Sequence, residues 1–175
     1  MELVEKAKQD YQAFEKLYEY YMPQIYGYLL SRVGNKEEAQ DLTSHTFEKA
    51  VLGLHDYEVR DNVHFSSWLY RIAANNLTDY YRRAGKKKAK DLQDYENKLA
   101  DEKSDQVENY ARRDQIRQAV MRLPEEYQNI IALKFYQDLD NEEISEIIGV
   151  SYNNLGVKLY RGLKKLKEIL SQDYE

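Results

Sequence analysis

The residues best suited to contact chemistry lie near the end of the chain, between residues 151 and 165. Amide, hydroxyl and basic side chains recur there at spacings that place them on one side of a helix. Such groups can hydrogen-bond to base edges in the major groove of DNA and to the neighbouring phosphates. An ordinary solvated helix face is the alternative interpretation. The candidates for duplex contact are Ser151, Asn153, Asn154, Val157, Lys158, Tyr160, Arg161 and Lys164.

A helix-turn-helix pattern would position these side chains. Three isoleucines between residues 144 and 148 give a short first helix one apolar side, and Gly149 suits the left-handed residue that ends a helix. Ser151 is a favourable N-cap for a second helix. In this motif the second helix enters the major groove. Its buried stripe is predicted from leucines at three- and four-residue steps, namely Leu155, Leu159, Leu163, Leu166 and Leu170.

The distribution of charge predicts two surfaces for nucleic acid in an otherwise acidic chain. The net charge of −5 is unfavourable for phosphate contact. However, residues 68–90 contain seven basic side chains and one acidic side chain, and residues 151–175 contain five basic and three acidic ones. Residues 91–150 have a net charge of −8. We therefore expect a partner to supply part of the affinity.

Catalytic chemistry has weaker support. Asp41, His45 and Glu48 share one face of a predicted helix and could ligate a metal, which makes a metal-dependent hydrolase the enzymatic alternative. Nothing nearby completes a tetrahedral ligand set, and the chain contains no Cys. A glycine-rich phosphate loop and a Ser/His/Asp signature are also absent from the sequence. We expect no catalytic residue, metal or cofactor.

The overall pattern predicts an all-α protein with two small helical domains and a charged linker. Two prolines, seven glycines and long stretches of helical period support this fold class. The predicted boundaries are 1–84 for the first domain, 85–108 for the linker, and 109–175 for a second domain that ends in the helix-turn-helix. No apolar run reaches the length of a membrane span, and the acidic, Tyr-rich start does not resemble a signal peptide, so we expect no membrane insertion.

Within the first domain, Pro23 is predicted to start a new helix after one that ends near Tyr21. Asn35 and Glu38 form a variant of the capping-box pattern before a helix whose apolar face runs from residue 39 to residue 54 and includes Val51. Residues 55–64 are predicted to form a loop. A long helix follows to about residue 83, with Trp68, Asn76 and Tyr80 among its inward residues.

Three blocks of sequence resemble segments of one family. Residues 68–76 (WLYRIAANN) resemble the promoter-melting segment of bacterial RNA polymerase sigma factors, and residues 38–47 (EAQDLTSHTF) resemble their polymerase-binding helix. Residues 123–127 (LPEEY), followed by the helix-turn-helix, resemble the fourth domain of these factors. The order of the blocks is similar to the short extracytoplasmic-function class of the sigma-70 superfamily. The resemblance covers nearly the whole chain outside residues 85–108.

This resemblance implies a transcription initiation factor of the cytoplasm, which fits the lack of Cys. Such a factor binds the clamp helices and flap of core RNA polymerase, directs it to promoters and assists DNA opening, and an anti-sigma factor is a further partner. The implied polymerase-binding residues are Asp41, Ser44, His45 and Glu48. The residues listed above for duplex contact would read the −35 element. The −10 element would be contacted by Arg71, Asn75, Asn76, Asp79, Arg82 and Arg83.

The sequence departs from the family pattern at several positions. The family often has Gln at the position of Ser44, Arg at the position of Gln128, and a Thr-Val-Lys run at residues 154–156. Gly156 costs the recognition helix about 1 kcal/mol of helix propensity, and it would allow a close approach of backbone to DNA. The alternative function is an autonomous helix-turn-helix regulator with an N-terminal sensor domain, which would bind duplex DNA unaided.

Overall fold

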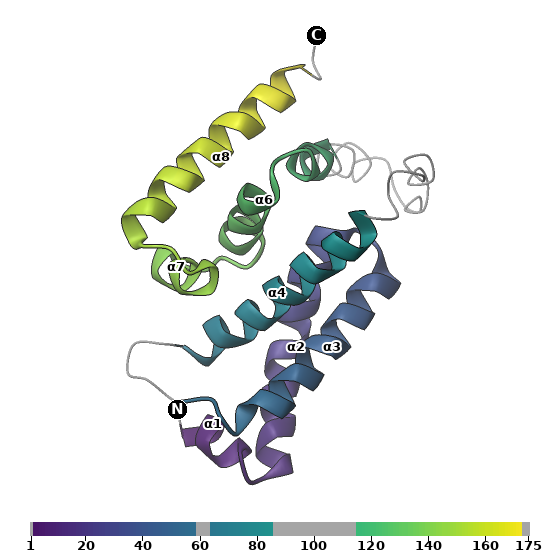
Figure 1. Cartoon of the computed structure of the whole chain (residues 1–175), viewed down its shortest axis with the longest axis vertical. Coiled ribbons are helices and arrows are strands. Elements are labelled where there is room, and N and C mark those ends of the chain that lie inside the picture. The colour runs from purple at the N-terminus through teal and green to yellow at the C-terminus, as the bar shows by residue number, and fades with distance from the viewer. Residues whose placement is uncertain (1, 59–63, 86–114, 173–175) are drawn as a thin grey trace, which may run out of the picture.

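The structure is a computed structural model that describes residues 2–58, 64–85 and 115–172 (Figure 1). No β-strand occurs among these residues, and the predicted all-α fold is confirmed. The predicted linker lies outside the described residues apart from Gly85, so the domain boundaries stay a prediction. The first half contains α1 (Glu2–Ala7), α2 (Tyr11–Val33), α3 (Lys36–Leu54) and α4 (Phe65–Gly85). In the second half, residues 115–121 are helical and are followed by α6 (Glu125–Ile131), the π-helix η1 (Ala132–Tyr136), α7 (Asn141–Ile148) and α8 (Tyr152–Gln172).

Helix α2 corrects one prediction, because it runs through Pro23 without a break. Proline removes one backbone donor and crowds the carbonyl four residues earlier, which normally ends or kinks a helix. Here Leu17 and Ile25, on either side of Pro23, are both buried in the same apolar cluster. Their packing therefore holds the two segments on one axis. The Asp10 side chain caps the start by accepting from the Gln12 N–H at 3.0 Å, and Gly34, with φ of 73°, ends the helix.

Helix α3 begins where the sequence predicted. The Asn35 side-chain oxygen accepts from the backbone N–H groups of Glu37 and Glu38, at 2.8 and 3.1 Å. Its buried face packs in the interior and comprises Ala39, Thr43, Thr46, Phe47, Ala50 and Leu54. Val51 is not part of that face, since 52% of its surface is exposed. Of the predicted loop, residues 59–63 lie outside the described part of the chain, whereas Tyr57 is buried.

The helix-turn-helix forms through local signals. The side chain of Asp140 accepts from the Glu143 N–H at 2.8 Å, while the Glu143 carboxylate accepts from the Asp140 N–H at 3.1 Å, which completes a capping box. Gly149 has φ of 74°, the left-handed conformation predicted for it, and its N–H donates to the Ser145 carbonyl at 2.9 Å. Ser151 caps the next helix by accepting from the Asn154 N–H at 3.4 Å. Two stable helix ends therefore set the turn.

The two halves of the chain pack against each other. Helix α7 lies on α4, and η1 lies on α2, while α8 runs along the far side of α6 and α7 (Figure 1). Leu133, Ile144 and Ile147 belong to the same apolar cluster as Ile25 and Leu69 of the first half. A second, smaller cluster forms where α8 meets Tyr127 and Ile131. The interior is therefore largely continuous across the two halves.

Candidate nucleic-acid interface

The second helix of the motif, α8, presents one buried side and one exposed side. Leu155 is fully buried, and Leu159, Leu166 and Leu170 are partly buried, as the leucine stripe predicted. Leu163 differs, because 38% of its surface is exposed and the neighbouring Gly162 packs on Tyr127 instead. Between Leu159 and Leu166, therefore, the buried contact of α8 is made by Gly162 and not by Leu163.

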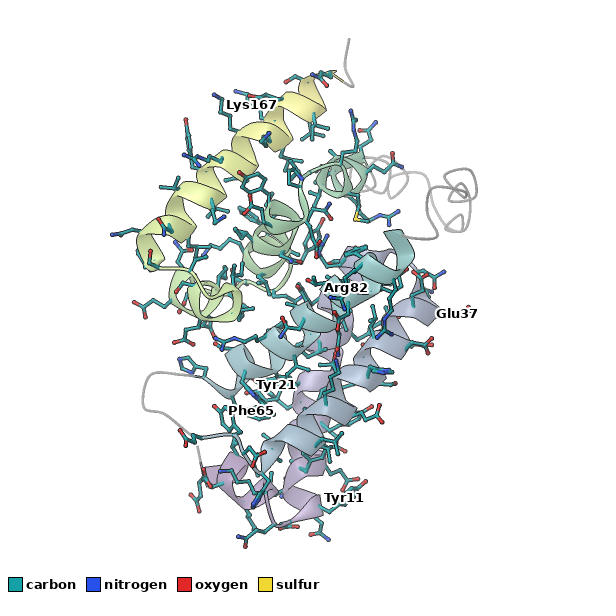
Figure 2. All side chains as sticks on the ribbon, in the orientation of Figure 1. Tyr11, Tyr21, Glu37, Phe65, Arg82 and Lys167 are labelled. Carbon is teal, nitrogen blue, oxygen red and sulfur yellow. The ribbon has the colours of Figure 1, made fainter. Side chains whose placement is uncertain are left out.

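Seven of the eight predicted duplex contacts are on the exposed side of α8 or at its start, namely Ser151, Asn153, Asn154, Val157, Tyr160, Arg161 and Lys164. Tyr160 is 69% exposed and Val157 48% exposed. The eighth residue, Lys158, is half-buried and forms an ion pair with Glu126 of α6. Its charge is partly neutralised, so it is the least available of the set for a phosphate (Figure 2 shows the side chains along α8).

Gly156 is exposed in the middle of this surface. A Cβ atom placed on it would meet no atom within 4 Å among the described residues. Internal packing therefore does not require glycine at this position, in contrast to Gly162, whose Cβ would come within 3.2 Å of Tyr127. A bare backbone at residue 156 leaves room for a partner to approach this side of α8 closely.

The second candidate surface lies on α4. Arg71, Asn75, Arg82 and Arg83 are exposed there, and Asp79 is partly exposed. The Asp79 carboxylate pairs with the Arg82 guanidinium at 3.0 Å. This pairing reduces the repulsion between Asp79 and a phosphate backbone. The Arg71 guanidinium donates to the backbone carbonyl of Glu146 in α7. These five residues therefore share one helix, but Arg71 is already engaged by the second half of the chain.

The assignment of Asn76 to the −10 contacts is corrected, because only 5% of its surface is exposed. Its amide nitrogen donates to the Thr46 hydroxyl at 3.1 Å, and its amide oxygen accepts from the Lys49 ammonium. Asn76 therefore joins α4 to α3 and does not present its side chain to a partner. The helical period already placed it on the inward side, but the two partners on α3 could not be identified from sequence.

The aromatic residues near the start of α4 belong mainly to the interior. Phe65 and Tyr70 are buried, and Trp68 is partly buried against Tyr57 and Phe65, with ring centroids 4.8 and 5.4 Å apart. Tyr80 is also partly buried. The prediction that Trp68 and Tyr80 pack inward is confirmed for part of each side chain. A strand of DNA on α4 would therefore meet mostly cations and amides.

A third surface, on α3, carries the predicted polymerase-binding residues. Asp41, Ser44, His45 and Glu48 are all exposed on one face. Leu52 follows Glu48 by four residues, so it extends this face by one helical turn, and it is 75% exposed. The sequence prediction did not include Leu52, although its position four residues after Glu48 places it on the same face. No group of three or more potential metal ligands occurs among the described residues. Nor does the described part of the chain include a helix long and apolar enough to cross a membrane.

Comparison with known proteins assigns this arrangement to a family. The family models for Sigma-70 region 2 and Sigma-70, region 4 match residues 17–87 and 113–166. The RNA polymerase sigma factor YlaC of Bacillus subtilis is 32% identical over 93% of this chain and 95% of its own length. The ECF RNA polymerase sigma factor SigW of the same organism is 30% identical over 95% and 92%.

Solved structures show the same fold. CnrH, in complex with the cytosolic domain of CnrY, superposes with a TM-score of 0.73 at 20% identity and covers 98% of this chain and 96% of its own. The sigma factor RpoE of Bartonella quintana, in complex with the anti-sigma factor NepR, gives 0.70 at 18% identity and covers 90% and 96%.

The candidate surfaces on α3 and α4 thus lie within the match to region 2, and the helix-turn-helix of α7 and α8 lies in the match to region 4. The chain belongs to the extracytoplasmic-function RNA polymerase sigma factors, which are transcription initiation factors. This membership favours the sigma-factor interpretation over an autonomous regulator.

Proposed function

We propose that the chain binds core RNA polymerase through the exposed face of α3, reads the −35 duplex with α8 and contacts the −10 element with α4. It thereby directs the enzyme to promoters and assists their opening. The observation that supports this best is the division of α8 into a packed side and an exposed side. Asn153 and Arg161 lie on the exposed side and can hydrogen-bond to base edges.

Arg161 is the sharpest test of duplex reading. A bidentate contact between arginine and guanine discriminates by about 1–3 kcal/mol, so Arg161→Ala in holoenzyme should weaken binding to a −35 duplex by about 5- to 150-fold. Lys167→Ala is the matched control, because it removes one exposed positive charge nearly two turns further along α8. Equal effects of the two variants would show that α8 contributes charge alone.

Dependence on polymerase separates this proposal from an autonomous regulator. With five basic residues in residues 151–175 and a net charge of −8 over residues 91–150, the free chain should bind promoter duplex weakly and in a salt-sensitive way. A mobility-shift assay should show specific binding after core polymerase is added. Nanomolar, sequence-specific binding by the purified chain alone would support the regulator.

The exposed α3 face supports the polymerase assignment. Asp41 and Glu48 supply negative charge, and Leu52 supplies an apolar contact next to them. A charged rim with an apolar anchor is a common arrangement at protein interfaces. We place this function in the cytoplasm and assign no catalytic step to the chain. By analogy with the NepR complex of RpoE, an anti-sigma protein is a further proposed partner, and co-purification from cells tests both partners.

A further inference from the structure

Val157 is an aliphatic side chain at the centre of the exposed side of α8. It is two residues from both Leu155 and Leu159, and a helix that turns by about 100° per residue places it opposite this packed stripe. Helix α8 packs on α6 and α7 along the stripe, and its other side faces outward (Figure 1). Val157 is accordingly 48% exposed, and it belongs to neither apolar cluster of the described residues.

The packing of the chain does not explain a valine at this position. A branched Cβ lowers helix propensity, so alanine would favour α8 more. Lone apolar residues are common on protein surfaces, and exposure alone is therefore no sign of a contact. The place of Val157 in the motif is more informative. Helix α8 begins at Tyr152, so Val157 lies within its first two turns, which in a helix-turn-helix contact base edges.

Groups that can hydrogen-bond to bases surround Val157 on the helix surface. Asn153 and Asn154 precede it by four and three residues, and Tyr160 and Arg161 follow it by three and four. Residues at these spacings are neighbours on a helix, and all four side chains are exposed. The centre of the duplex-reading face therefore presents two methyl groups within a ring of amide, phenol and guanidinium groups.

An A·T base pair has the matching chemistry in the major groove. Adenine presents N7 and its N6 amino group, to which an asparagine amide can form two hydrogen bonds. Thymine presents O4 and an apolar C5-methyl group. Contact between an aliphatic side chain and this methyl group removes apolar surface of both from water. Asn153 and Val157, one turn apart on α8, therefore suit the two bases of such a pair.

Gly156 allows this contact to form. The valine side chain is short, so its methyl groups reach a base only if the helix backbone comes close to the floor of the groove. A Cβ atom on Gly156 would meet no described atom within 4 Å, and its absence leaves the backbone bare on this side. Lys158 is drawn towards α6 by its ion pair with Glu126. Its ammonium group therefore does not stand between Val157 and a base.

We propose that Val157 selects an A·T pair in the −35 element by contact with the C5-methyl group of its thymine. This inference rests on the proposed function of α8. It assigns a base to a side chain that offers neither a hydrogen bond nor a charge. Discrimination at this pair then comes from apolar contact, in contrast to the guanine contact expected of Arg161.

Replacement of thymine by uracil tests the contact, because uracil lacks the C5-methyl group and keeps the hydrogen-bonding groups of thymine. The −35 element is first selected by the holoenzyme from duplexes that are randomised in this region. Each thymine of the selected element is then replaced in turn. Uracil at one of these positions should weaken binding of the holoenzyme by about fivefold, which corresponds to roughly one buried methyl group.

Two matched variants test whether the effect belongs to Val157. In Val157→Ala holoenzyme, the effect of uracil at that position should fall below about twofold, because the two changes remove the same contact. Val51→Ala makes the same change at a similarly exposed valine on α3, and its holoenzyme should keep the full effect of uracil. Neither variant should lower the melting temperature, since alanine is the stronger helix former.

Three results would each overturn the methyl contact. They are a selected element without a fixed A·T pair, tolerance of uracil at every thymine, and an effect of uracil that persists in Val157→Ala. In each case Arg161→Ala on the same duplex distinguishes this failure from a failure of the proposed function. If Arg161→Ala still weakens binding, α8 reads the duplex without Val157. If Arg161→Ala also has no effect, the proposed −35 function of α8 is refuted as well.

Discussion

Asn75 and Asn76 are adjacent identical residues for which the structure predicts opposite behaviour. Asn75 is exposed on α4, whereas Asn76 is buried and hydrogen-bonded to Thr46 and Lys49. Asn76→Ala removes both bonds. Thr46 keeps its own donation to the Leu42 carbonyl at 2.7 Å, and Lys49 is exposed and can return to water. Because water replaces the bond to Lys49, the net loss is the buried hydrogen bond to Thr46 plus a small packing defect. The free energy of unfolding should therefore fall by about 2 kcal/mol.

Urea unfolding measures this difference. With a dependence of unfolding free energy on urea of about 2 kcal/mol per M, Asn76→Ala should lower the midpoint by about 1 M. Asn75→Ala should leave the midpoint unchanged within about 0.5 kcal/mol. In holoenzyme, Asn75→Ala should reduce permanganate reactivity at the −10 element. An unchanged midpoint for Asn76→Ala would refute the buried assignment, and full promoter opening with Asn75→Ala would refute the contact assigned to α4.

Three further predictions test other parts of the molecule. Asp41→Arg should weaken co-purification with core polymerase without lowering the melting temperature, because Asp41 is exposed on α3; normal recovery would mean that this face is not the contact. Gly156→Ala should stabilise the chain by about 1 kcal/mol in thermal unfolding while weakening −35 binding in a mobility shift; unchanged binding would exclude a close backbone approach. Burial raises the pKa of Tyr28 and of Tyr70 in the folded chain. The stability that these two hydroxyls contribute is therefore complete below the unfolded tyrosine pKa of about 10, and it is lost as the pH rises from there towards the raised folded values. A free energy of unfolding that stays constant above pH of about 10 would contradict this.

Local signals made the helix-turn-helix predictable. Gly149 and Ser151 act within one turn of their own position, so their conformations follow from residue type. The exposed face of α8 followed from the leucine period in the same way. The half-buried position of Lys158 could not be predicted in this way, because its ion-pair partner Glu126 lies 32 residues away in the sequence.

Features that depend on distant parts of the chain were not predictable. The course of α2 through Pro23 depends on the packing of Leu17 and Ile25 in the interior, which local propensity does not include. The buried hydrogen bonds from Arg32 to Gln128 and to Asn129 join residues that are 96 and 97 positions apart. Their residue types indicate polar surface positions, and burial appears only when the two halves meet.

The continuous interior has a consequence for synthesis on the ribosome. The first half contains Ile25 and Leu69, but its cluster is completed by Leu133, Ile144 and Ile147. At a translation rate of about 5–20 residues per second, α4 emerges several seconds before α7 does. During that interval the nascent first half presents an apolar surface that is later covered. A chaperone that binds apolar segments should therefore associate with chains stalled after residue 85 and dissociate from chains that extend beyond α7.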